Sequence, residues 1–422
     1  MKVIFWQKGI KSFVHSRCYQ LVFLLLLTGC TQKQIFDENR SVYFLNDFDP
    51  KGSMWFEHIL EQQNGDVRLY GYDSTRKNIV TALVLNNQTR VSVTKEPFID
   101  KKFGELDNYT NGFKLTYVNS ENSIFVMNRY GSFIKKLSFE GNTELDFDLN
   151  TSGDFGDNLN TMPFILPDGG IIYATKKSDY DVKEPFELIQ LDKNGEFIRK
   201  LYLSMITLDF MPRTVEILDF VEDDYVTLYG ACNRNDGSDQ VKTYVAVFNL
   251  QTAREIKSLI INENERTTIE GPHLAHKSPN GIVILLAPNT SPFADFYNPT
   301  FKINEMDMKG ENLWQTDVDI DALRVVPWHM SKTPDNGWLV VGWCIQGDSN
   351  TDKPFVVKVD KNGKMVFSKV FTIGNFSRFH VGKQLQNGDL FFAGTTLALG
   401  NSASADFFTL RTNSKGEYLN VE

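Results

Sequence analysis

The feature that most constrains the fold of this chain is a tight-turn signal that recurs at a nearly fixed period. It separates runs of β-branched and aromatic residues, and it occurs at Gly65, Gly112, Gly169, Asp224, Gly281, Gly337 and Gly388. The steps are 47, 57, 55, 57, 56 and 51 residues. Asn-Gly and Asp-Gly pairs permit the positive φ angles of two-residue hairpin turns, so each signal predicts a β-hairpin.

A second hairpin turn follows each first one. These turns lie at Gly131, Gly195, Gln251, Gly310, Gly363 and Gly416, with a weaker one near Asn87. Each period therefore predicts four antiparallel strands, lettered A to D. Seven such units predict an all-β fold, a β-propeller with seven four-stranded blades. A β-sandwich would give no fixed period, and a parallel β-helix would need a much shorter one.

The first 29 residues have the pattern of a secretion signal, with basic residues before the apolar run "LVFLLLL". That run is too short to span a bilayer. It ends in Leu27-Thr28-Gly29-Cys30, which resembles the lipobox of bacterial lipoproteins. The resemblance implies cleavage before Cys30, lipidation of its sulfur and, because Thr31 follows, an outer-membrane location. An ordinary signal peptide with an incidental cysteine is the alternative.

We therefore divide the chain into a signal peptide (1–29), a lipidated cysteine with its tether (30–50) and a propeller (51–422). The strand at 41–45 is expected to pair with the first or last blade and close the ring. Loss of the four positive charges of the signal takes the net charge from −9 to −13. This balance argues against nucleic acid or anionic lipid as a main partner. Cys232 and Cys344 remain in the body, too few for a disulfide framework.

Two segments resemble a repeat of secreted and lipid-anchored bacterial propellers. They are "DGGIIYAT…FELIQLDKNGEFIRKLYL" in the third unit and "DNGWLVVGW…PFVVKVDKNGKMVFSKVF" in the sixth. The repeat runs D-G-G-(apolar)-G, a loop, then K-(apolar)-D-x-x-G. The resemblance implies a propeller fold and a location in the cell envelope. It implies no particular activity, because its motif residues are turn and core positions.

The two faces of the predicted propeller differ in loop length. The A–B and C–D turns are tight and share one face, called the turn face here. The B–C loops share the opposite face, the loop face, and several are long: 176–186, 232–243, 288–301, 344–355 and 396–408. Variable loops on a rigid scaffold are where binding and catalysis usually occur. We therefore expect function on the loop face.

Four histidines fall at nearly one register before the A–B turns of four consecutive blades: His58, His273, His329 and His380. We expect them to approach one another near the mouth of the central channel. Neutral imidazole is both a metal ligand and a base near pH 7, so the set is a candidate ligand or proton-transfer site. A solvated channel lining shared through duplication is the alternative. No metal or cofactor is assigned.

Aromatic residues form a second candidate site. Trp343 ends a B strand, Trp328 adjoins His329, and Phe296 and Tyr297 lie in the longest neighbouring loop. Exposed aromatic rings beside polar loops stack on sugars or anchor protein partners. Packing between blades is the alternative for these rings.

The sequence thus favours a non-enzymatic outer-membrane lipoprotein. It would be held in the membrane through Cys30 and would bind a protein or glycan partner. The alternative is a polysaccharide lyase or hydrolase that uses the histidines, with or without a metal. The sequence contains no P-loop, no G-x-S-x-G, no H-E-x-x-H and no nucleic-acid module.

Overall fold

The computed structural model describes the strands and most of the tight turns. The described residues are 42–45, 54–73, 78–84, 91–94, 113–118, 123–128, 133–137, 143–148, 164–166, 168–176, 186–205, 210–212, 215–221, 224–234, 241–261, 274–286, 300–307, 311–347, 351–373, 376–396 and 406–419. All regular elements among them are strands. Within these ranges there is no helix long and apolar enough to cross a membrane.

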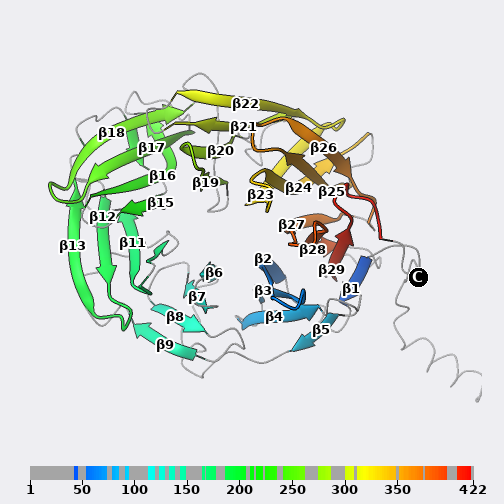
Figure 1. Cartoon of the computed structure of the whole chain (residues 1–422), viewed down its shortest axis with the longest axis horizontal. Coiled ribbons are helices and arrows are strands. Elements are labelled where there is room, and N and C mark those ends of the chain that lie inside the picture. The colour runs from blue at the N-terminus through cyan, green and yellow to red at the C-terminus, as the bar shows by residue number, and fades with distance from the viewer. Residues whose placement is uncertain are drawn as a thin grey trace, which may run out of the picture.

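The described strands form seven antiparallel sheets arranged around a common centre (Figure 1). In blades one to three, five and six the first strand is innermost and the following strands lie successively farther out. This radial repetition is a β-propeller. The predicted fold class is therefore confirmed, whereas the number of blades in the whole chain stays a prediction.

Blades one to three follow the N-terminal strand. Their strands are β2 (Met54–Glu61), β3 (Val67–Asp73), β4 (Asn78–Val84) and β5 (Val91–Thr94); β6 (Phe113–Val118), β7 (Ser123–Asn128), β8 (Phe133–Leu137) and β9 (Thr143–Asp148); and β10 (Phe164–Ile165), β11 (Ile171–Lys176), β12 (Phe186–Leu191) and β13 (Phe197–Leu203).

Blade four has five strands, and blades five to seven have four each. Their strands are β14 (Phe210–Pro212), β15 (Glu216–Val221), β16 (Tyr225–Arg234), β17 (Val241–Asn249) and β18 (Arg254–Ile261); β19 (Ala275–Lys277), β20 (Ile282–Leu286), β21 (Thr300–Met306) and β22 (Asn312–Asp319); β23 (Arg324–Lys332), β24 (Trp338–Ile345), β25 (Asp352–Val359) and β26 (Met365–Val370); and β27 (Arg378–Gln384), β28 (Leu390–Thr396), β29 (Asp406–Thr412) and β1 (Val42–Leu45).

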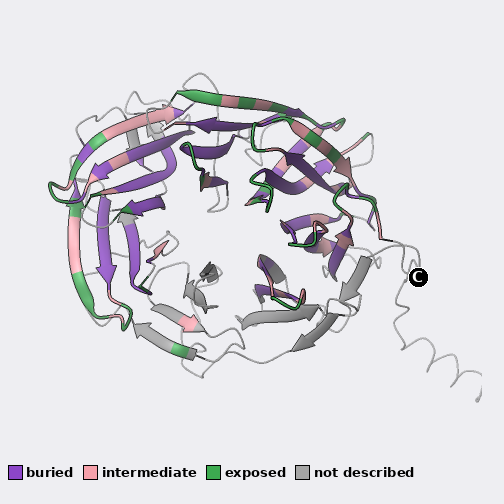
Figure 2. Cartoon of the chain, viewed as in Figure 1, coloured by how far each residue is buried: buried purple, intermediate pink, exposed green. Residues whose placement is uncertain are grey.

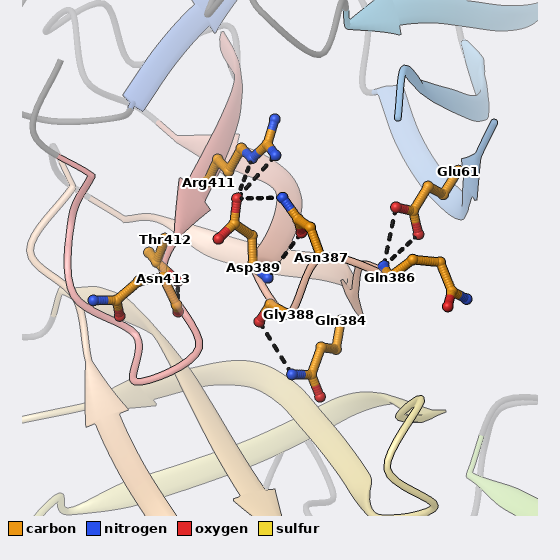
Figure 3. Close-up of polar contacts among 9 residues, drawn as sticks. All are labelled: Glu61, Gln384, Gln386, Asn387, Gly388, Asp389, Arg411, Thr412 and Asn413. Carbon is orange, nitrogen blue, oxygen red and sulfur yellow. Dashed lines mark hydrogen bonds and ion pairs between the residues drawn. The ribbon is translucent and has the colours of Figure 1, made fainter. Parts of the chain in front are cut away.

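The N-terminal strand closes the ring. β1 pairs with β29 and becomes the outermost strand of blade seven. This confirms the expected closure and assigns it to the last blade. On the inner side, the carboxylate of Glu61 in blade one accepts the backbone N–H of Gln386 in blade seven at 2.8 and 3.0 Å (Figure 3). An ion pair at 2.8 Å between Asp389 and Arg411 connects the same turn of blade seven to β29.

The hairpin turns differ from the expected two-residue type. The N–H of Gly195 donates to the carbonyl of Asp192, while the N–H of Asp192 donates to the carbonyl of Glu196. Three residues thus separate the paired ends, and Gly195 has φ of 83°. This is a type I turn followed by a left-handed residue. The Asp192 carboxylate accepts the N–H groups of Asn194 and Glu196, which explains the aspartate that opens the DKNG motif.

Burial falls from the inner strands to the outer strands (Figure 2). In blade three every residue of β12 is buried, whereas in blade five only Val318 of β22 is buried. Apolar residues of neighbouring blades interleave, so one buried cluster runs across blades four, five and six. Buried clusters also join blades three to four and six to seven, so these blades hold the ends of their described strands in fixed relative positions.

Candidate functional site

A β-bulge shapes the inner strands that border the candidate site. In β23 the pairing with β24 shifts between Pro327 and His329, so that Trp328 is the extra residue. Gly342 lies opposite Pro327, and a Cβ at Gly342 would collide with the carbonyl oxygen of Val326. β2 and β27 carry the same bulge opposite Gly71 and Gly394. The glycine of the second strand therefore makes room for a bulge that redirects one inner side chain.

The position of the A–B turn in blade six changes the register of the predicted histidines. The left-handed turn residue of blade six is Asn336, not Gly337, and it corresponds to Gly65 and Gly388. Counted from these residues, His58 and His329 are equivalent and follow the bulge. His380 lies one position earlier and is itself the extra residue of β27.

His329 lies near two other histidines. Burial, with a further contribution from the nearby His276 and His58, lowers the pKa of His329 to about 3. His276 from blade five contacts the Met330 carbonyl at 2.8 Å through Nε2, and its ring lies 5.5 Å from the ring of Trp338. Histidines from blades one, five and six are therefore brought together. His273, Phe296 and Tyr297 lie outside the described residues.

The His380 side chain lies in a different environment from that of His329. Its Nε2 lies 3.1 Å from the hydroxyl of Thr395. Burial, with a smaller contribution from Arg378, lowers the pKa of His380 to about 3. Both His329 and His380 are therefore neutral at physiological pH. Across the described parts of the chain, no group of three or more His, Cys, Asp or Glu side chains is placed to hold a metal ion.

Aromatic and charged side chains of blades six and seven meet near the loop face. The rings of Trp328 and Trp343 lie 5.2 Å apart, and the Arg378 guanidinium lies 4.7 Å from the centre of the Trp343 ring. Arg378 also forms an ion pair with Asp352 at 2.5 Å. We call Trp328, Trp343, Arg378 and Asp352 the tryptophan cluster.

The tryptophan cluster combines a buried carboxylate with partly exposed side chains. Asp352 is buried, and its backbone carbonyl accepts the N–H of Ser377 at 2.8 Å, which ties the start of β25 to the segment before β27. The buried carboxylate orients the guanidinium of Arg378 on Trp343. The bulge projects Trp328, which is 40% exposed, and the Arg378 side chain is 41% exposed. Such an arrangement can stack on a flat ligand and donate hydrogen bonds beside it.

Sequence reasoning identified Trp343 and Trp328 but missed three partners. Arg378 and Asp352 lie 26 residues apart, and no spacing rule marks them, because their contact depends on how blades six and seven pack. His276 was left out because it does not share the register of the other histidines. Its ring stacks near Trp338 only because β19 packs beside β23. Cys232 and Cys344 are buried and form no disulfide in the part of the chain that the structure describes.

Comparisons with known proteins find only distant similarity to solved structures. No protein-family model matches the chain, and no curated protein matches it. Similar solved structures include the virginiamycin B lyase of Staphylococcus aureus (10% identity, TM-score 0.46, 87% of this chain and 98% of that chain). They also include the oligogalacturonate lyase of Vibrio parahaemolyticus (12%, 0.49, 87% and 93%) and YCF48 of Cyanidioschyzon merolae (10%, 0.48, 87% and 98%). At TM-scores below 0.5 this similarity carries no argument about the chain.

Proposed function

We propose that this protein is an outer-membrane lipoprotein, anchored through Cys30, whose propeller binds a glycan at the tryptophan cluster. The observation that carries the proposal is the exposed Trp328, which a bulge projects beside Trp343 and Arg378. A glycan suits this geometry better than a protein partner, because one flat ring with hydrogen-bond donors at its edge matches one sugar ring.

The charges of the tryptophan cluster indicate which class of glycan it prefers. Asp352 is buried, whereas the Arg378 side chain is 41% exposed, so the positive group faces solvent and the negative group does not. A guanidinium keeps further N–H donors after it has paired with one carboxylate. We therefore infer a preference for sugars with acidic substituents.

The enzyme alternative is less well supported by the geometry. A general acid or base works best with a pKa near the working pH. Burial lowers the pKa of His329 and His380 to about 3, so neither takes up a proton near neutral pH. A binding site does not require a side chain whose pKa lies near the working pH.

Substitution of Trp328 tests the proposal. The purified full-length protein is titrated with polygalacturonate as an acidic glycan and with dextran as a neutral one, and binding is followed by tryptophan fluorescence and calorimetry. We expect Trp328→Ala to weaken polygalacturonate binding tenfold or more, because a stacked aromatic anchor contributes about 2 kcal/mol. Leu323→Ala is the matched control, since Leu323 is also 40% exposed and lies before β23 on the loop face.

Two results would contradict the proposal. One is wild-type protein that binds neither glycan. The other is binding that Trp328→Ala and Leu323→Ala reduce equally. A stronger response to dextran than to polygalacturonate would retain the site but refute the preference for acidic sugars.

A further inference from the structure

The outer strands of blades three to six share an exposed aliphatic residue at one structural position. In each, a bulge lies just after the C–D turn, and the extra residue projects from the sheet. These residues are Ile198, Ile256, Leu313 and Val366, with 50%, 59%, 47% and 55% of their surface exposed. We call them the outer aliphatic set. In blade two the same bulge position holds Glu144.

The outer aliphatic set lies on the turn side of the propeller. Ile198, Ile256 and Val366 each follow the left-handed residue of their C–D turn by three positions. Because the blades are related by rotation about one axis, equivalent positions have the same height along that axis. The four strands that carry the set, β13, β18, β22 and β26, follow one another along the perimeter (Figure 1). A flat surface perpendicular to the axis can therefore meet all four residues.

The direction of β1 places the N-terminal tether on the same side. Val42 pairs with Leu410, and Leu45 pairs with Phe407. β29 runs toward the turn that contains Gly416, so β1 begins at its turn-side end. Eleven residues lie between Cys30 and Val42. At about 3.3–3.6 Å per extended residue, the tether reaches at most about 40 Å.

We propose that the turn face docks on the lipid surface through the outer aliphatic set, and that the tryptophan cluster consequently points away from the membrane. This inference rests on the proposed anchorage through Cys30. The short tether confines the propeller near the bilayer, and the exposed aliphatic side chains enter its interfacial layer. The net charge of −13 after signal cleavage disfavours electrostatic attraction to anionic lipid, so the contact is apolar and uses zwitterionic lipid.

Site-specific lipid quenching tests this orientation. The full-length lipoprotein is reconstituted in vesicles of phosphatidylcholine and phosphatidylethanolamine that contain doxyl-labelled lipid. Val366→Cys and Ile256→Cys carry an environment-sensitive fluorophore on the turn side, and Leu323→Cys carries it on the loop face. The native Cys232 and Cys344 are buried and do not compete for the label. We expect quenching at Val366→Cys and Ile256→Cys to be at least twice that at Leu323→Cys.

The outcomes separate this inference from the anchorage on which it rests. If the protein floats with the vesicles but the three positions are quenched equally, the orientation is wrong and the anchorage stands. A second copy of the chain that covers the outer aliphatic set would also leave Val366→Cys unquenched and would refute the inference. If the protein does not float with the vesicles, and Cys30→Ala leaves that result unchanged, both the anchorage and the orientation are refuted.

Discussion

At the scale of single residues, the left-handed glycines in the C–D turns of blades six and seven lie against the preceding blade. A Cβ at Gly363 would collide with the ring of Trp314 from the preceding blade, and the Thr316 hydroxyl donates to the Gly363 carbonyl. A Cβ at Gly416 would lie only 3.2 Å from the Phe367 ring, and the carbonyl of Gly416 accepts the Lys369 ammonium at 2.6 Å. The glycine of DKNG therefore serves both the turn and the packing between blades.

Substitution of two glycines by alanine separates these effects. Gly363 and Gly388 have φ of 78° and 92°, but a Cβ at Gly388 has no atom within 4 Å. We expect Gly388→Ala to lower the free energy of unfolding by about 1–2 kcal/mol, the cost of a left-handed alanine. Gly363→Ala should cost at least about 3 kcal/mol, because Trp314 must also move. Urea unfolding measures both, and equal losses would show that the contact with Trp314 is unimportant.

At the scale of elements, the ring depends on a strand from the other end of the chain. β1 is an edge strand, bonded on one side to β29. In such a strand successive N–H groups point alternately toward the neighbouring strand and away from it. Proline has no N–H, so an edge strand tolerates it at outward-facing positions and loses a ladder bond at inward-facing ones.

We therefore expect Tyr43→Pro and Phe44→Pro to differ in stability. One of the two should lower the free energy of unfolding by about 1–3 kcal/mol, because it leaves a carbonyl of β29 without its hydrogen-bond partner, and the other by clearly less. Thermal and urea unfolding of both variants provide the measurement, with wild type as the reference. Two variants as stable as wild type would show that β1 contributes nothing to closure.

The sequence predicts the elements well and their contacts poorly. The period of the turn signals gives the blades, and turn chemistry gives the C–D hairpins, because these features are local. The three-residue form of the turns was missed, since Asn-Gly suits both two- and three-residue hairpins. The alignment of His380 with His329 was wrong by one position, because the left-handed turn residue of blade six is Asn336 and not the glycine that follows it. The contact of Arg378 with Trp343 depends on packing between blades and has no local signal at all.

At the scale of the whole molecule, the blades meet around buried neutral histidines. His329 and His380 are 8% and 2% exposed, and burial lowers the pKa of each to about 3, below the value of 6.5 expected in the unfolded chain. Below pH 6.5 the unfolded state therefore binds more protons than the folded state. The corresponding stability is fully present above pH 6.5 and is lost as the pH falls toward 3.

Acid titration of stability tests this account of the centre. Each histidine contributes a slope of about 1.4 kcal/mol per pH unit within that window, so the two together contribute somewhat less than about 3 kcal/mol per unit. Urea unfolding at pH 7.5, 6.0 and 5.0 measures the slope above the range in which most carboxylates titrate. We expect His380→Gln to be less stable than wild type at pH 7.5 and to have about half its slope between pH 6.0 and 5.0. A wild-type stability that does not change between pH 7.5 and 5.0 would mean that these histidines are protonated in the folded ring, and hence that water reaches them.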